Sequence, residues 1–172
     1  MKFISIGGST CSGKSSVIKY VMANQNRLYR LSYDLSKWSF SKYDPKLHAD
    51  DARKVLFAVL ETVCALGYDI ISDVTLRKDT REHFIEIAQS HGYEIIEIKL
   101  EAPYEVLEKR FDERVTHATE NNVTMISNLS KERFVELYTI YQDEKNPNAL
   151  AFDTSARSVE EIGEKILELL AH

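Results

Sequence analysis

The residues with the clearest chemical meaning form a glycine-rich segment near the N-terminus, GSTCSGKS, from Gly8 to Ser15. The segment matches the pattern G-x-x-x-x-G-K-[ST] of phosphate-binding loops, between an apolar run and a stretch with helical spacing. Glycines let the backbone bend around an anion held by amide N–H groups, and the following helix points its positive end at that anion. The pattern therefore predicts a nucleoside triphosphate site. The alternative is a Gly/Ser-rich turn that happens to carry a lysine.

Two side chains of this loop have distinct predicted roles. Lys14 would reach the β- and γ-phosphate oxygens and act in catalysis, and the Ser15 hydroxyl would coordinate Mg²⁺. The predicted cofactors are therefore ATP and Mg²⁺. We expect the nucleotide to contact Gly8, Ser9, Thr10, Cys11, Ser12, Gly13, Lys14, Ser15 and Ser16.

Short β-rich runs alternate with longer helical patterns along the chain, which is typical of a parallel sheet flanked by helices. We expect one α/β domain over residues 1–172, with a five-stranded parallel sheet. The strands are predicted near 2–6, 28–33, 69–72, 94–99 and 149–152, and the helices near 14–24, 48–66, 79–91, 103–115, 131–142 and 158–170. The polar segment 116–130 is predicted to be a lid over the nucleotide.

Two carboxylates follow predicted strands, where ligands of such sheets bind. Asp34 ends the run Leu28–Tyr33, and Asp73 ends the run Tyr68–Ser72. A carboxylate in this position can accept a proton from an attacking hydroxyl or hold Mg²⁺ through water, so one would be the base and the other the metal organiser. The alternative is that each aspartate opens a turn or caps a helix.

Arg110 and Arg114 are four residues apart and therefore share one helix face, at the end that leads into the lid. They could close over the triphosphate and neutralise charge in the transition state. The alternative is a solvated face on which they pair with Glu108 and Glu113.

The composition of the chain does not identify the substrate whose hydroxyl would receive the phosphate. The segment from Arg27 to Lys54 mixes basic and aromatic residues, which can hold a base and its phosphate but more often form a packed cap with a solvated edge. The net charge of −5 argues against a surface for many nucleic-acid phosphates. No apolar run approaches the length needed to span a membrane, and the N-terminus lacks signal-peptide features, so a cytoplasmic protein is expected.

The chain resembles the small P-loop kinases related to polynucleotide kinase, zeta toxins and chloramphenicol phosphotransferase. The resemblance rests on GGSTCSGKS, on Asp34, and on the runs IISDVTLRKDTREHF, YEIIEIKLEAPYEVLEKRFDERV and AFDTSARSVEEI. It implies a nucleoside-kinase-like P-loop fold with a lid, with Lys14 and Ser15 binding phosphate and Mg²⁺, Asp34 as the general base, and Arg110 and Arg114 as lid arginines. We then expect the other aspartate, Asp73, to organise the metal. It also implies that Asp153–Arg157 passes near the adenine, with Ser155 and Arg157 as nucleotide contacts.

Two departures bear on the substrate. Polynucleotide kinases have an arginine shortly after the catalytic aspartate, where the nearby residue here is Lys37, and a Thr-Asn pair where this chain has Val74-Thr75. We therefore expect a kinase that phosphorylates a hydroxyl of a small metabolite or nucleoside. The alternatives are a polynucleotide 5′-hydroxyl kinase and, from another class, a regulatory NTP-binding switch. The switch is disfavoured because the chain has no Asn-Lys-x-Asp motif for guanine.

Overall fold

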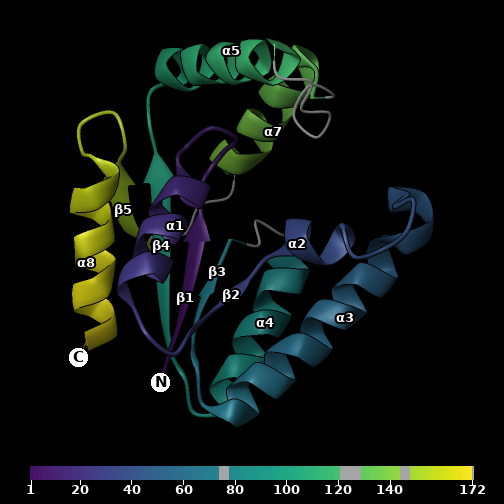
Figure 1. Cartoon of the computed structure of the whole chain (residues 1–172), viewed down its shortest axis with the longest axis vertical. Helices are drawn as coiled ribbons and strands as arrows, with labels where there is room; N and C mark the ends of the chain where they lie inside the picture. The colour runs from purple at the N-terminus through teal and green to yellow at the C-terminus, as the bar shows by residue number, and fades with distance from the viewer. Residues whose placement is uncertain (74–77, 121–128, 144–147, 172) are drawn as a thin grey trace.

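Five parallel strands form a central sheet with helices on both of its faces (Figure 1). The computed structural model describes residues 1–73, 78–120, 129–143 and 148–171. The strand order is β2-β3-β1-β4-β5, which confirms the predicted five-stranded parallel α/β fold. The strands are Lys2–Gly7 (β1), Leu28–Leu31 (β2), Asp69–Ser72 (β3), Glu94–Glu101 (β4) and Leu150–Asp153 (β5). The helices are Lys14–Asn24 (α1), Tyr33–Lys37 (α2), Pro45–Leu66 (α3), Lys78–Ser90 (α4), Tyr104–Glu120 (α5), Lys131–Asp143 (α7) and Val159–Ala171 (α8).

The two faces of the sheet are covered by different helix pairs. Alternate residues of a strand point to opposite faces, so Ile4 packs with the core under α1 and α8, whereas Phe3 packs with the core under α3 and α4. Both residues are almost fully buried. Because both faces are covered, the loops at the C-terminal ends of the strands are left to build a site.

The segment between β2 and β3 differs most from expectation. β2 ends at Leu31, and Tyr33–Lys37 forms the short helix α2, so Asp34 lies in a first helical turn and not at the end of a strand. The next helix begins at Pro45 and not at residue 48, because the Asp44 side chain caps it by accepting from the Lys46 N–H (2.8 Å).

The helices α5 and α7 lie beyond the C-terminal end of the sheet (Figure 1). They pack together through Leu107, Phe111 and Phe134, which form a small core of their own. α5 extends to Glu120, so the first five residues of the predicted lid are helical. Residues 121–128 of that lid lie outside the described residues. No helix within the described ranges is long and apolar enough to cross a membrane.

Candidate active site

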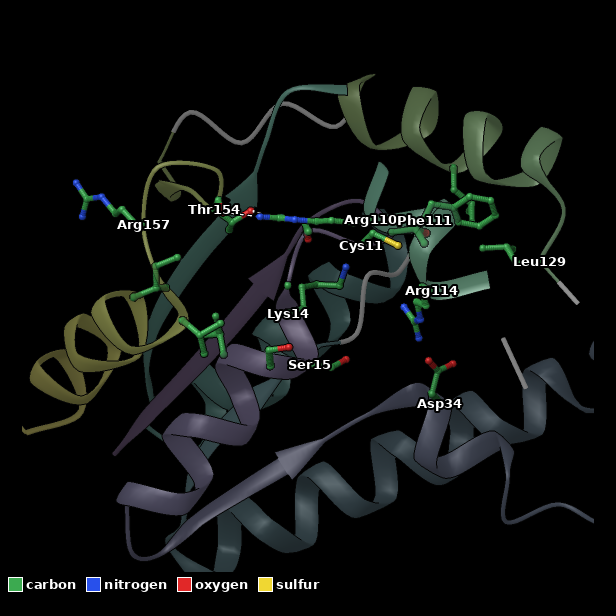
Figure 2. A pocket seen from close by; sticks show the side chains of 18 of the residues that line it. Cys11, Lys14, Ser15, Asp34, Arg110, Phe111, Arg114, Leu129, Thr154 and Arg157 are labelled. Carbon is green, nitrogen blue, oxygen red and sulfur yellow. Dashed lines mark hydrogen bonds between the residues drawn. The ribbon is translucent and has the colours of Figure 1, made fainter. Parts of the chain in front are cut away.

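A cavity of about 820 Å³ opens where β1, β2 and β5 end (Figure 2). Its middle is the loop before α1 and the start of that helix. At one end, here called the charged end, Asp34 of α2 and Arg114 of α5 contribute their side chains (Figure 2). The lining residues are Thr10, Cys11, Ser12, Gly13, Lys14, Ser15, Ser16, Val17, Asp34, Lys37, Arg110, Phe111, Arg114, Leu129, Leu137, Thr154, Arg157, Val159 and Ile162.

Glycines shape the loop in the middle of the cavity. Gly8 has φ 154° and Gly13 has φ 90°, a region of backbone conformation that side chains disfavour. A Cβ on Gly8 would also lie 2.6 Å from the Leu100 carbonyl oxygen, so the loop must approach β4 closely here. Cys11 adopts φ 66° without being glycine, which marks a tight bend. This is the geometry expected of a phosphate-binding loop, although Gly8 and Ser9 do not line the cavity.

Lys14 is folded back onto its own loop. Its Nζ donates to the carbonyl oxygens of Gly8 (2.6 Å) and Ser9 (2.8 Å). Burial lowers the pKa of Lys14 to about 8, and the negative charge of Asp73 is the strongest influence in the opposite direction. A desolvated ammonium whose two hydrogen bonds are to neutral carbonyls gains much by meeting an anion, so this lysine is suited to a triphosphate.

Asp34 and Arg114 face one another across the charged end of the cavity (Figure 2). The Asp34 side chain is 74% exposed, and Lys37 Nζ lies 2.5 Å from its Oδ1. The predicted alternative partners of the arginines are engaged elsewhere, because Glu108 pairs with Lys131 (3.1 Å) and Glu113 with Lys109 (3.9 Å). The structure thus brings the predicted base and one predicted lid arginine to the same place.

Arg110 lies one helical turn before Arg114 and also lines the cavity, but it has a different partner. Its Nη1 donates to Thr154 Oγ1 (2.9 Å) and its Nη2 donates to the Thr154 carbonyl oxygen (2.7 Å). Arg110 therefore ties α5 to the loop after β5. Sequence reasoning missed Thr154, because no local spacing connects two residues so far apart in the chain.

Asp73 does not line the cavity. Its side chain is 11% exposed, and Arg30 Nη2 lies 2.5 Å from its Oδ2. Ser15, the other predicted metal ligand, does line the cavity. Among the residues that the structure describes, no three His, Cys, Asp or Glu side chains come close enough to hold a metal ion. A Mg²⁺ at Ser15 would therefore take most of its ligands from phosphate and water, as this ion commonly does.

The two predicted adenine contacts lie apart. Ser155 is outside the cavity wall, and its hydroxyl donates to Asp153 Oδ1 (2.6 Å). Arg157 lines the cavity, but its guanidinium lies over the Phe152 ring (5.6 Å) and points away from Lys14 (Figure 2). The apolar lining residues Val17, Val159 and Ile162 were missed because apolar residues at helical spacing are normally read as core.

Comparison with known proteins identifies a matching family and several similar structures. The family described as AAA domain matches residues 4–138. No curated protein matches the sequence. Similar solved structures include a provisionally assigned kinase from Chloroflexus aurantiacus (TM-score 0.74, 18% identity, covering 99% of this chain and 96% of that chain). The APS kinase CysC of Mycobacterium tuberculosis, in complex with AMPPNP and APS, is similar too (TM-score 0.67, 19% identity, 99% and 98% coverage). So is a sugar kinase from Janibacter (TM-score 0.66, 16% identity, 99% and 95% coverage).

Proposed function

The chain belongs to the AAA-domain family and has the fold of the small P-loop kinases, and from this premise we propose that it transfers the γ-phosphate of ATP to a hydroxyl of a small metabolite or nucleoside. The observation that carries the proposal is that Lys14, Asp34 and Arg114 line one cavity although they come from three separate elements. A phosphate binder, a carboxylate and a second cation around one space are the parts that phosphoryl transfer to a hydroxyl needs.

In the proposed reaction, the acceptor oxygen forms a bond to the γ-phosphorus while the bond to the β,γ-bridging oxygen breaks, and the electron pair leaves with ADP. Asp34 accepts the proton of the attacking hydroxyl. Lys37, at 2.5 Å, keeps that carboxylate at the edge of the cavity. Lys14 and Arg114 approach the transferred group from the other side and neutralise its charge.

The residues present fit a magnesium ion. Bound Mg²⁺ would supply positive charge that neutralises part of the charge of the phosphates. The Ser15 hydroxyl is the protein ligand that lines the cavity. Asp73, whose charge acts strongly on Lys14, is proposed to organise the water around the ion.

The size of the cavity supports a small acceptor. Small-molecule sites commonly have volumes of roughly 300–1,000 Å³, and about 820 Å³ is near the upper end of that range. Such a space suits a nucleotide together with a compact second substrate. The apolar side chains of Phe111 and Leu129 lie on the same side of the cavity as Arg114 (Figure 2), where an acceptor with an apolar face would pack.

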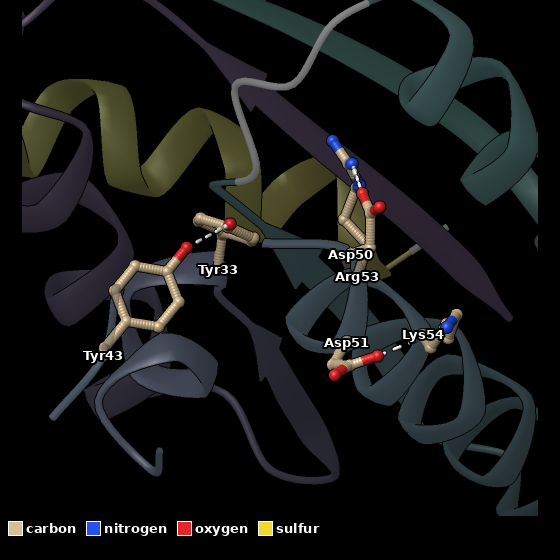
Figure 3. Close-up of polar contacts among 6 residues, drawn as sticks. All are labelled: Tyr33, Tyr43, Asp50, Asp51, Arg53 and Lys54. Atoms are coloured by element: carbon tan, nitrogen blue, oxygen red, sulfur yellow. Dashed lines mark hydrogen bonds and ion pairs between the residues drawn. The ribbon is translucent and has the colours of Figure 1, made fainter. Parts of the chain in front are cut away.

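The basic and aromatic segment gives a second argument for a small acceptor. Figure 3 shows the hydrogen bond between the hydroxyl groups of Tyr33 and Tyr43 (2.7 Å). Four of its seven basic residues are paired with carboxylates: Arg30 with Asp73, Lys37 with Asp34, and, as Figure 3 also shows, Arg53 with Asp50 and Lys54 with Asp51. Cations that already have carboxylate partners form a packed cap more readily than a track for nucleic-acid phosphates. This favours a small acceptor over a polynucleotide.

The proposal is tested by incubating the protein with γ-labelled ATP, Mg²⁺ and a pooled library of hydroxyl compounds and 5′-hydroxyl oligonucleotides. We expect label on a small compound with the parent protein, none with Lys14→Ala, and parent-level labelling with Lys165→Ala. Lys165 is a suitable control because it lies on α8 and pairs with Glu168 (2.7 Å), away from the cavity.

Two outcomes would replace the proposal. Labelling of long oligonucleotides alone, with a steep loss on adding salt, would make the protein a polynucleotide kinase. Slow hydrolysis of bound ATP without transfer to any hydroxyl would indicate a regulatory switch.

A further inference from the structure

The chain contains a single tryptophan, and it lies at the end of the short helix that carries the proposed base. Trp38 follows Asp34 by four residues, and residues at this spacing share one face of a helix. The Trp38 N–H donates to the Asp34 carbonyl oxygen (3.3 Å), so the backbone is still helical up to Trp38. The indole and the carboxylate therefore belong to the same face of α2.

The ammonium of Lys37 shows that the indole lies beside the carboxylate. Lys37 Nζ lies 2.5 Å from Asp34 Oδ1 and 5.2 Å from the centre of the Trp38 ring. A cation over an aromatic face is attracted by the electrons of the ring, so both neighbours hold this ammonium. Asp34 and Lys37 line the cavity and Trp38 does not, so the indole provides surface next to the cavity, at the base.

The indole does not complete any core that the structure describes. Trp38 is 50% exposed, and it belongs to none of the three clusters of buried apolar side chains among the described residues. The neighbouring rings of Phe40 and Tyr43 pack edge to face and also pack against His48, whereas no described aromatic ring packs against Trp38. Keeping so large an apolar side chain in water is unfavourable, and exposed tryptophan is typical of binding surfaces.

Other apolar side chains surround the base. Leu35 is 57% exposed and lies three residues before Trp38, so the two are neighbours on the surface of α2. Phe111 and Leu129 lie on the opposite side of the cavity, where Arg114 lies (Figure 2). A substrate whose hydroxyl reaches the base would therefore find apolar surface on both sides.

The position of the indole favours one chemical class of acceptor. A hydroxyl held at Asp34 brings the rest of the acceptor within reach of Trp38. Flat rings stack on aromatic side chains whatever hydrogen-bonding groups they carry, because every such ring has a π-face. An acyclic polyol has no such face and would leave the indole in water. The surroundings of the base therefore suit a ring-bearing acceptor better than an acyclic one.

We propose that Trp38 binds the acceptor by stacking on a flat ring, so that the substrate is a hydroxyl compound that carries an aromatic ring or heterocycle, as a nucleoside does. The proposal rests on the proposed function, because it takes the position of the acceptor from the role of Asp34. Trp38 then selects the acceptor, while Asp34 acts on its hydroxyl. The ATP site is independent of this contact.

The first test uses the labelling assay with acceptors in matched pairs that share sugar hydroxyls and differ by a flat ring. The pairs are uridine beside methyl β-D-ribofuranoside, and phenyl β-D-glucopyranoside beside its methyl counterpart. We expect kcat/KM to be about 5- to 150-fold higher for the ring-bearing member. Equal labelling within the pairs, or label on saturated compounds alone, would overturn the proposal. Label on no hydroxyl compound would instead overturn the proposed function, so the two failures are distinguishable.

The fluorescence of the protein gives a readout that does not depend on turnover. Because Trp38 is the single tryptophan, the indole emission reports on this position alone. With Mg²⁺ and AMPPNP bound, adding the ring-bearing member of the labelled pair should quench or shift the emission, and its saturated partner should not. Unchanged emission at a saturating concentration of the ring-bearing compound would refute stacking on Trp38.

Substitutions separate binding from positioning. Trp38→Leu should raise KM for the ring-bearing acceptor by about 5- to 150-fold and leave KM for ATP within about twofold, and Trp38→Tyr should restore most of the loss. Leu66→Ala is the matched control, because Leu66 is also exposed but ends α3, and it should change neither constant. A fall in kcat with an unchanged acceptor KM would contradict the proposal, since Trp38 would then act only by holding Lys37 against Asp34.

Discussion

Arg30 Nη2 lies 2.5 Å from Asp73 Oδ2, so the carboxylate at the end of β3 is held by an arginine of the neighbouring strand. The Asp73 side chain is 11% exposed, and its charge is the strongest favourable influence on the Lys14 ammonium. A single carboxylate thus links the edge strand β2 to the phosphate-binding loop.

Removing Arg30 should weaken the fold. Arg30→Met removes the cation that lies against the largely buried Asp73 carboxylate, and a hydrogen bond to a charged group contributes about 1.5–3 kcal/mol. The free energy of unfolding, measured by urea titration, should fall by that amount. Arg27→Met is the control on the same edge, because Arg27 is exposed and donates to the Gly67 carbonyl oxygen (3.2 Å). If the free energy of unfolding fell equally in the two variants, the Arg30–Asp73 pair would contribute no more to stability than an exposed arginine does.

Asp73 and Asp34 should differ in their effect on Mg²⁺. Asp73→Asn should raise the Mg²⁺ concentration needed for half-maximal turnover, because it removes the negative charge proposed to organise the water of the ion. Asp34→Asn should leave that concentration unchanged. A Mg²⁺ titration that moves for the Asp34 variant alone would require the two roles to be exchanged.

Nucleotide affinity should depend on pH through Lys14. In the free protein the pKa of Lys14 is about 8, so the side chain is charged below that pH and neutral above it. A triphosphate favours the charged form, so the affinity for AMPPNP should be level below pH 8 and fall by about tenfold per pH unit above it. Lys14→Arg keeps its charge, and its affinity should stay level across the same range. A parent curve that is as flat as that of the variant would refute this role of Lys14.

Substitutions of the two arginines of α5 should change different steady-state constants. Arg114 faces Asp34 across the cavity, so Arg114→Met should lower kcat by roughly 10³-fold, as the loss of a charge-neutralising arginine does. Arg110→Met should act mainly on KM for the nucleotide, because Arg110 positions the Thr154 loop. The reverse assignment of the kcat and KM effects would contradict this division of roles.

The loop from Gly8 to Ser15 could be predicted from the sequence because its chemistry is local. Each residue type in it is required by a nearby backbone bend or by the helix that follows. The alternation of strands and helices is also a local signal, and it was enough for the five-stranded parallel fold. The Ser158 and Glu161 pair shows the same principle, since a three-residue spacing defines the cap that the structure contains.

The contacts that complete the site could not be predicted in this way. Arg30 and Asp73 are 43 residues apart, and Arg110 and Thr154 are 44 apart, so only the folded sheet brings them together. The short helix α2 was missed because it buries no apolar residue and has no periodic signal. As a result Asp34 was placed at the end of a strand, although it lies in a helical turn where Lys37 can reach it.

The account depends most directly on Asp34 as the base, and the decisive measurement separates nucleotide binding from phosphoryl transfer in Asp34→Asn. An amide keeps the size of the side chain but cannot take the proton. We therefore expect the AMPPNP dissociation constant to stay within about twofold of the parent, while transfer of labelled γ-phosphate to the acceptor falls by roughly 10²–10⁴-fold. Transfer at nearly the parent rate, with binding intact, would contradict the central claim.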